Sequence, residues 1–176
     1  MDGLRMWGRL GDAQYFCGTS YSVYNIFKKQ TSDLTFENAK LEDVLTSNKY
    51  DQVYIILGYN EAGYDYNNLM DQFHYVIARI REAQPSARII LHAVMHASAR
   101  VAKKFSYYSV KHLDKINDGL KAIALEGDNM YFIDCNAPFC DEKGYLLKHV
   151  SNDGEHLTPK YTAQWAQEIM IRAIIN

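Results

Sequence analysis

The stretch that decides the fold is Tyr50-Asp51-Gln52-Val53-Tyr54-Ile55-Ile56-Leu57-Gly58. Its near-continuous run of β-branched and other apolar residues predicts a strand that is buried on both faces of a parallel sheet. Similar apolar runs at residues 87–95 and 130–134 predict two more buried strands. Amphipathic helices are predicted at residues 67–83, 110–124 and 158–174. Strands that alternate with helices over short connections predict an α/β fold, a parallel sheet with helices on both faces.

Other parts of the sequence carry weaker signals for local structure. A short strand is predicted at residues 14–19, running into a loop at Gly18. Residues 96–105 are polar and are predicted to form a loop. Short helices are predicted, from apolar residues at helical spacing, at residues 3–10, 22–29 and 36–47.

The composition is that of one globular domain spanning residues 1–176. The net charge of −2, without a basic stripe, argues against nucleic acid or an anionic membrane as the main partner. No apolar run is long enough for a membrane span, and the first residues lack a signal-peptide core. These observations leave the cellular location open.

Cysteines and loop motifs give no sign of a bound metal or cofactor. Cys17, Cys135 and Cys140 are an odd set without metal-ligand spacing, so we expect free thiols. We find no phosphate-cradling loop and no dinucleotide fingerprint. His92 and His96 would lie about 13 Å apart on a strand, too far to share one ion. We therefore expect neither a metal nor a cofactor.

The strongest chemical signal is Ser151-Asn152-Asp153-Gly154-Glu155-His156-Leu157-Thr158-Pro159-Lys160. Thr158 can cap the following helix and Pro159 can occupy its first position, so the turn is fixed to a scaffold. Asp153 could then accept a hydrogen bond from one ring nitrogen of His156 and leave the other nitrogen as a general base. The alternative interpretation is an ordinary surface turn.

Two further positions point to the same chemistry. Asn60 follows the most buried strand through Gly58, and Gly18 follows the predicted strand at residues 14–19. Ligands of parallel α/β sheets bind outside the carboxyl ends of the strands, where both residues are predicted to lie. The Asn60 amide and the Gly18 backbone N–H could form an oxyanion hole. Alternatively, Gly58 and Asn60 only form a tight turn.

At these residues the chain resembles the SGNH (GDSL-type) hydrolases. Leu57-Gly58-Tyr59-Asn60-Glu61 looks like the third conserved block, Gly-x-Asn-Asp, and Asp153-Gly154-Glu155-His156 looks like the fifth block, Asp-x-x-His. The resemblance implies a three-layer, flavodoxin-like sandwich. It implies that His156 is the base, Asp153 its orienting carboxylate, and Gly18 and Asn60 the oxyanion donors. We expect Tyr59, Glu61 and His96 to line the cleft and contact substrate.

The chain departs from the family pattern in two places. Glu61 stands where the pattern has Asp, and no Gly-Asp-Ser motif, which carries the family's nucleophilic serine, occurs in the sequence. We expect the first central strand, which bears that serine, to be missing. Exposed strand edges would then favour self-association. Ser20 and Ser22 follow Gly18 but lack the strand-to-helix elbow that activates a nucleophile.

The favoured interpretation is an ester hydrolase that acts on a small acyl ester, for example an O-acetyl group on a carbohydrate. One alternative is a non-catalytic carbohydrate or small-molecule binding module that keeps the cleft without the nucleophile. The other is an unrelated flavodoxin-like binding protein in which Asp153 and His156 are structural.

Overall fold

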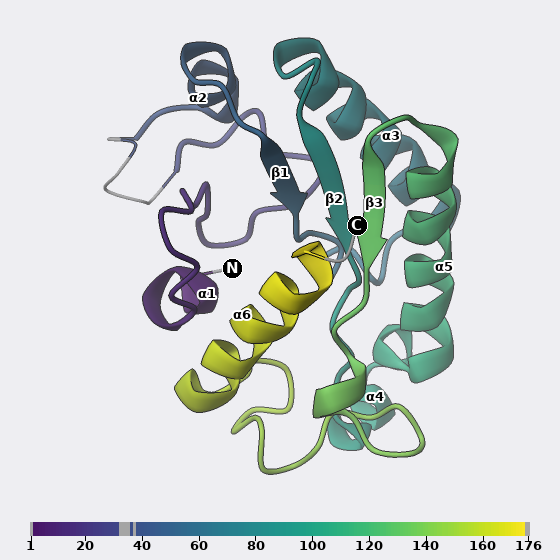
Figure 1. Cartoon of the computed structure of the whole chain (residues 1–176). Helices are drawn as coiled ribbons and strands as arrows, with labels where there is room; N and C mark the ends of the chain where they lie inside the picture. Colours follow the sequence, from purple (N-terminus) through teal and green to yellow (C-terminus); the bar gives the residue numbers. More distant parts are fainter. Residues whose placement is uncertain (1, 32–35, 37, 175–176) are drawn as a thin grey trace.

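The computed structural model describes residues 2–31, 36 and 38–174, and these contain a three-stranded parallel sheet (Figure 1). The strands β1 (Gln52–Ile55), β2 (Arg88–His92) and β3 (Met130–Ile133) lie in the order β1-β2-β3. Val53 pairs with Ile89, and Leu91 pairs with Phe132. β2 is the middle strand, and its side chains from Ile89 to His92 are buried, as the continuous apolar run predicted.

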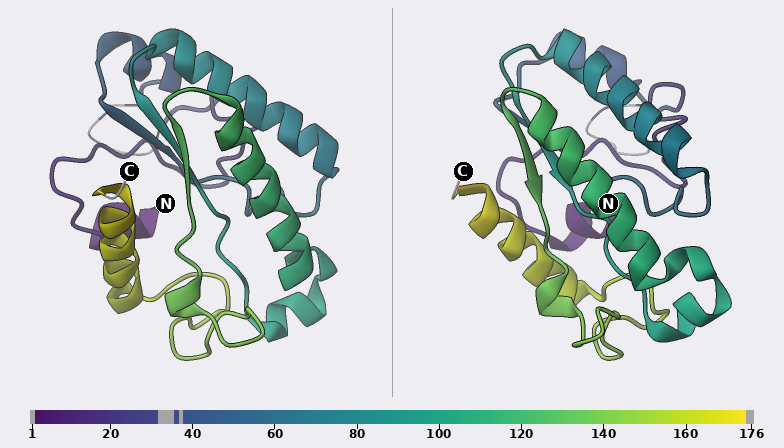
Figure 2. Two further views of the ribbon diagram at one scale, coloured as in Figure 1. Left: turned by 45° about the vertical axis from the view of Figure 1, so that its right-hand side comes forward. Right: turned by 90° about the vertical axis from the view of Figure 1, so that its right-hand side faces the viewer.

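Helices cover both faces of the sheet (Figure 2). Helices α3 (Tyr66–Ala83) and α5 (Val110–Glu126) cover one face, where their apolar sides pack with Ile89 and Leu91. Helices α1 (Asp2–Trp7) and α6 (Pro159–Ile174) cover the other face, where Ile90 packs in the same cluster as Leu4, Trp165 and Ile169. Because successive residues of a strand point to opposite faces, β2 contributes to both clusters. This arrangement confirms the predicted three-layer α/β sandwich.

The helix ends follow their sequence signals. Asp65 precedes α3, and its side chain accepts a hydrogen bond from the Asn68 backbone N–H (3.0 Å), as an N-cap residue does. α3 stops at Gln84 because Pro85 disfavours helical backbone in the residue before it. The remaining short helices are α2 (Leu41–Ser47), α4 (Ala99–Lys104), η2 (Ser106–Tyr108) and η3 (Ala137–Phe139).

Several predictions for local structure were wrong. Residues 14–18 form no strand, and residues 23–28 form a series of turns instead of a helix. The predicted loop at 96–105 contains α4. The helix predicted at 36–47 begins only at Leu41, although residues 32–35 and 37 lie outside the described part. The failed strand has a physical reason: a strand needs a neighbour to pair with, and residues 14–18 pair with no strand of the described sheet.

β1 lies at an edge of the sheet, since no other strand in the described ranges pairs with its outer side. Its side chains are only partly buried except for Ile55, whereas those of β2 are buried almost throughout. Strand β1 therefore presents unpaired backbone groups on one side. None of the helices in the described part combines the length and apolar character that a bilayer crossing requires.

Candidate active site

Asp153 and His156 contact each other directly. The Asp153 Oδ2 atom lies 2.7 Å from Nδ1 of His156, and Asp153 Oδ1 accepts the backbone N–H groups of Glu155 (2.9 Å) and His156 (2.8 Å). The carboxylate therefore fixes both the turn and the ring. The His156 side chain is 79% exposed, and its Nε2 forms no hydrogen bond with any other described residue. This nitrogen is open to a ligand.

Ser151 holds the Asp153 carboxylate from the other side. Its hydroxyl donates to Asp153 Oδ1 (3.0 Å) and accepts the Gly154 backbone N–H (2.8 Å). Burial by itself would raise the pKa of Asp153, but the hydrogen bonds from the backbone of His156 and Glu155 and from the His156 and Ser151 side chains outweigh it. The pKa of Asp153 consequently lies well below its usual range, so the carboxylate stays ionised next to the imidazole at neutral pH.

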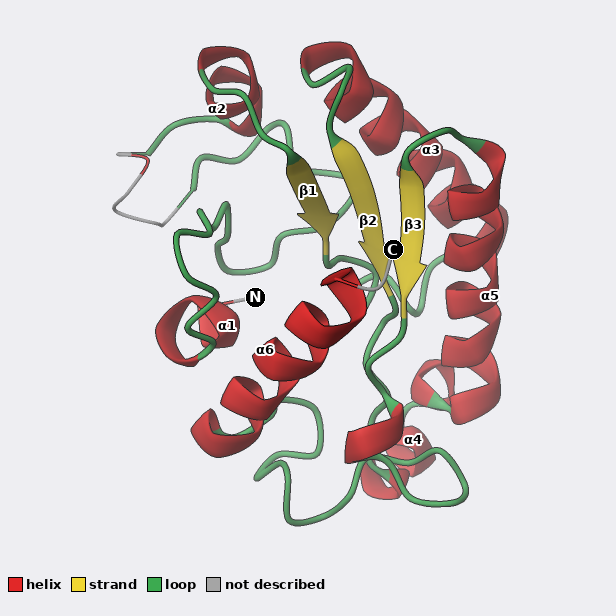
Figure 3. Cartoon of the chain, viewed as in Figure 1, coloured by secondary structure: helices red, strands yellow, loops and turns green. Residues whose placement is uncertain are grey.

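Figure 3 shows that β2 continues into a loop segment that leads to α4. Residues at the end of this segment form hydrogen bonds with the Asp153 turn. Gly154 has a φ of 86°, and a Cβ there would lie 2.2 Å from the Ser98 hydroxyl oxygen. The Ser98 backbone N–H donates to the Gly154 carbonyl (2.9 Å), and the Arg100 guanidinium donates to the Asp153 carbonyl. Sequence reasoning missed Ser98, Arg100 and Ser151. The one sequence signal was Gly154, because a glycine allows another segment to approach the backbone closely. It does not indicate which segment that is.

The turn after β1 is shaped by Gly58. Its φ is 111°, and a Cβ would lie 2.8 Å from the Val94 side chain, so only glycine fits. The turn presents Asn60, whose Nδ2 donates to the Tyr21 carbonyl (2.9 Å). Asn60 is exposed, and its amide carries a second N–H that this bond does not use.

Gly18 lies against the same segment as Asn60. A Cβ at Gly18 would come within 3.0 Å of the Tyr21 ring, and the Tyr21 carbonyl is the acceptor for Asn60. The structure therefore connects the two predicted oxyanion donors through Tyr21, although they lie more than 40 residues apart in sequence.

Tyr59 connects the Asn60 turn with the Asp153 turn. Its ring stacks on that of Tyr108 with centroids 4.5 Å apart. Burial, together with the nearby charges of Glu155 and Asp153, raises the pKa of Tyr59 far above its usual value. Burial and Glu155 likewise raise the pKa of Tyr108 to about 12. Tyr59 is half-buried, as a residue that lines a cleft would be.

The comparisons with known proteins identify the family of this chain. The model of the GDSL-like lipase/acylhydrolase family matches residues 9–162, which is most of the chain. The chain belongs to this family. A comparison with curated proteins found no significant relative.

Solved structures with the same fold include several esterases. A carbohydrate esterase of family 3 from Talaromyces cellulolyticus is 16% identical, with a TM-score of 0.62 over 88% of this chain and 67% of its own. An acetyl esterase variant with an acetate ion is 15% identical, with a TM-score of 0.61 and the same coverage. A GDSL-like lipase from Bacteroides thetaiotaomicron is 19% identical, with a TM-score of 0.54 over 71% of this chain and 62% of its own. The chain spans 59% of another match. At these identities the likeness shows the fold alone.

Two residues that we expected to contact substrate are buried in this member of the GDSL-like family. Glu61 is 1% exposed, and its Oε1 accepts the Val23 backbone N–H (2.6 Å). His96 is 7% exposed, with Nδ1 2.6 Å from the Gly144 carbonyl and Nε2 3.1 Å from a carboxylate oxygen of Asp114. The Nε2 contact lacks the geometry of a hydrogen bond, although the ion-pair distance is short.

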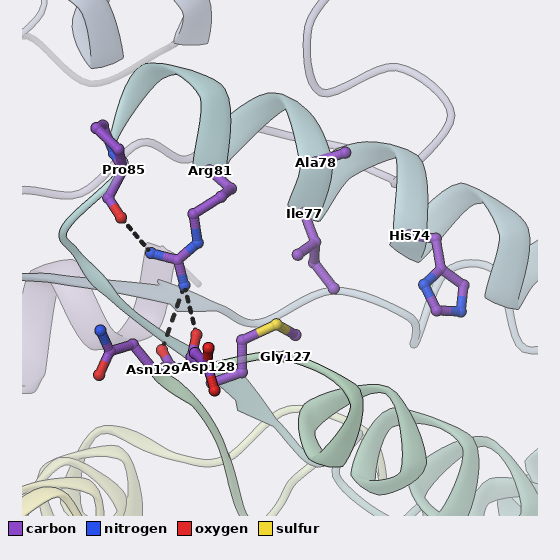
Figure 4. Close-up of a pocket in the computed structure, with 9 residues that line it drawn as sticks. His74, Ile77, Ala78, Arg81, Pro85, Gly127, Asp128 and Asn129 are labelled. Carbon is purple, nitrogen blue, oxygen red and sulfur yellow. Dashed lines mark hydrogen bonds between the residues drawn. The ribbon is translucent and has the colours of Figure 1, made fainter.

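A separate hollow of about 450 Å³ lies away from these turns, between α3 and the connection from α5 to β3 (Figure 4). Arg81 crosses it and donates to the carbonyls of Pro85 (3.2 Å) and Asp128 (3.2 Å). Its guanidinium is thus used to tie backbone segments together, which is a structural role. In the described part of the chain, no three His, Cys, Asp or Glu side chains come together in a way that could hold a metal ion.

Proposed function

We propose that this chain acts in the hydrolysis of a small acyl ester by an SGNH-type mechanism. The observation that carries the proposal is the 2.7 Å contact between Asp153 Oδ2 and His156 Nδ1, with Nε2 exposed and unoccupied. An ionised carboxylate at Nδ1 selects the tautomer in which Nε2 has the lone pair. His156 is therefore prepared to accept a proton at Nε2, and Asp153 stabilises the imidazolium that forms.

In this mechanism a serine hydroxyl attacks the ester carbonyl and gives its proton to Nε2 of His156. The carbonyl oxygen becomes an oxyanion, which Gly18 N–H and the unused Asn60 amide N–H would stabilise. Each such donor contributes a few kcal/mol of transition-state stabilisation, on the order of 3 kcal/mol. His156 then returns the proton to the leaving alcohol, and a water molecule hydrolyses the acyl-serine by the same route.

The serine is the component that the described residues do not place beside His156. Ser151 bonds Asp153 instead, and the sequence has no Gly-Asp-Ser motif. Ser20 is exposed and has a φ of 58°, but it lies in a turn and not at a strand-to-helix elbow. An acyl-serine mechanism therefore requires a serine from outside the described residues, or Ser20 or Ser22 in an unusual role.

The substrate that we propose is an O-acyl group on a carbohydrate. Among the solved structures with this fold, three are of carbohydrate esterases, from family 2 or family 3, and one is of an acetyl esterase with acetate. The exposed His156, and the partly exposed Tyr59 and Tyr108 near Glu155, are compatible with a polar alcohol that carries a short acyl group. A sugar can pack its apolar face on such rings.

A second candidate is a non-catalytic carbohydrate-binding module. The observation in its favour is the same open Nε2, because no described serine hydroxyl bonds it. In this case Asp153, His156 and Asn60 would recognise a polar ligand without turnover.

Labelling with a fluorophosphonate serine probe, followed by intact-mass analysis, separates the candidates. The probe is applied to this chain and to a chain extended by the residues that the codons before Met1 encode. Both chains are also tested as the variants His156→Ala and His74→Ala. His74 is an exposed histidine away from the site, so His74→Ala is the matched control. His156-dependent labelling of either chain supports the hydrolase, and peptide mapping names the serine. If neither chain is labelled while an acetylated oligosaccharide still binds, the hydrolase proposal is wrong and the binding module is favoured.

A further inference from the structure

Glu61 is a buried carboxylate whose presence needs an explanation. It is 1% exposed and directly follows Asn60. Among the described residues it is the only acidic residue that is buried. No Lys or Arg in the described ranges forms an ion pair with it, so its charge is not neutralised by a cation. A buried carboxylate is costly unless hydrogen bonds compensate, so its hydrogen bonds indicate what it does.

Backbone amides offset part of that cost. Glu61 Oε1 accepts the Val23 N–H at 2.6 Å, the shortest amide contact in this part of the molecule. Burial raises the pKa of Glu61, and the amides of Val23, Glu61 and Gly58 act in the opposite direction. The second oxygen, Oε2, forms no hydrogen bond of good geometry. The Glu61 carboxylate thus joins the turn after β1 to Val23, which lies 38 residues earlier in the sequence.

The hydrogen bonds between the two segments run in opposite directions. Val23 donates to Glu61, and Asn60 donates to the Tyr21 carbonyl at 2.9 Å. The neighbouring side chains of Asn60 and Glu61 therefore bind the segment from Tyr21 to Val23 at both ends, at the Tyr21 carbonyl and at the Val23 N–H. Removing the Glu61 contact leaves the bond from Asn60 to Tyr21 as the remaining one of these two links between the turn after β1 and the segment.

The backbone directly before the segment from Tyr21 to Val23 is strained. Ser20 has a φ of 58°, a conformation that a non-glycine residue keeps only when its surroundings enforce it. Its carbonyl accepts the Asn25 side-chain amide (3.1 Å), and the neighbouring Tyr21 ring packs on Gly18. The position of the Gly18 N–H consequently depends on how firmly Tyr21 and Val23 are held.

We infer that Glu61 is a positioning residue, which holds the Gly18 segment and Asn60 in the mutual geometry that an oxyanion hole requires. The inference rests on the proposed function for its catalytic meaning. Glu61 does not touch the reacting atoms. It acts through the Val23 amide and through the turn that presents Asn60. A side chain that only filled space would be replaceable by an isosteric neutral group, whereas a carboxylate that gathers amides is not.

Three variants test this inference. Glu61→Gln keeps the shape but removes the charge, so the Val23 N–H would meet a neutral and therefore weaker acceptor. Glu61→Asp keeps the charge on a side chain one methylene shorter, as in the family pattern. Glu82→Gln, on the exposed side of α3, is the matched control for loss of one carboxylate.

The first readout is amide hydrogen exchange of the 176-residue chain, followed by NMR at Val23. Glu61→Gln should speed exchange at Val23 and its neighbours at residues 18–25 by about tenfold, while the amides of β2 change less than about twofold. Glu61→Asp should restore part of the protection, and Glu82→Gln should have no effect. Unchanged exchange at Val23, or equal loss of protection throughout the molecule, would refute the inference.

The second readout is kinetic and uses the chain that the serine probe labels. Because the oxyanion forms only in the transition state, Glu61→Gln should lower kcat about tenfold or more with little change in KM. The effects of Glu61→Gln and Asn60→Ala should be less than additive, since both disturb the same donor. Full activity of Glu61→Gln refutes Glu61 as a positioning residue and leaves the hydrolase proposal intact. If no chain is labelled, the proposed function fails, and the catalytic role of Glu61 fails with it.

Discussion

His92 makes the fold sensitive to acid in a way that can be measured. It is the last residue of β2 and is 1% exposed. Its Nε2 accepts the indole N–H of Trp165 at 2.9 Å, and its Nδ1 lies 2.6 Å from the Ala93 carbonyl. Because the indole N–H can only donate, Nε2 must carry a lone pair and Nδ1 the proton. The folded protein therefore requires a neutral imidazole at this position.

The magnitude follows from the pKa. Burial lowers the pKa of His92 from 6.5 to about 4 in the folded protein. Between these values the unfolded chain binds a proton that the folded chain does not, so the free energy of unfolding falls as the pH falls. The stability is complete above pH 6.5 and is lost progressively down to about pH 4. A difference of about 2.5 pKa units corresponds to about 3 kcal/mol.

Urea unfolding of the wild type and of His92→Gln, at about pH 7 and about pH 4.5, isolates this contribution. Glutamine offers a donor and an acceptor but does not titrate, so the variant should lose about 2–3 kcal/mol less than the wild type over this range. His74→Gln removes an exposed histidine and should behave like the wild type. Parallel losses in wild type and His92→Gln would refute the reasoning. Since Trp165 belongs to α6, which begins just after the His156 turn, acid should also loosen the candidate site.

Two further predictions concern the site turn and the sheet edge. Gly154→Ala combines a φ of 86° with a Cβ placed 2.2 Å from the Ser98 hydroxyl oxygen, so we expect the free energy of unfolding in urea to fall by about 2–4 kcal/mol. The control is Gly11→Ala, where φ is 64° and the space is open, and it should cost about 1 kcal/mol. Equal losses would contradict the close contact between Gly154 and Ser98. The unpaired edge of β1 should cause self-association. Sedimentation velocity should show a weight-average mass that rises with protein concentration, and a monomer at all concentrations would contradict this prediction.

The sequence determined the fold through patterns that are local. Apolar runs at β1, β2 and β3 predicted the strands of a parallel sheet between helix layers, and the middle strand β2 is the one whose side chains are buried almost throughout. The pair Asp153 and His156 was also readable, because three residues in a turn before a helix bring the two side chains within reach. Weak patterns failed at residues 14–28, where structure depends on partners and not on spacing.

The tertiary structure alone decided which residues hold the site together. Glu61 and His96 carry polar groups and were expected in the cleft, yet each is buried against backbone groups from distant segments. Ser98 and Arg100 reach the Asp153 turn from the segment after β2, more than 50 residues earlier in sequence. Hydrogen bonds of this kind depend on where two segments meet after the sheet has formed. The residue spacing within either segment gives no sign of such a contact. The sequence therefore predicted the base and its carboxylate, but not the residues that fix them in place.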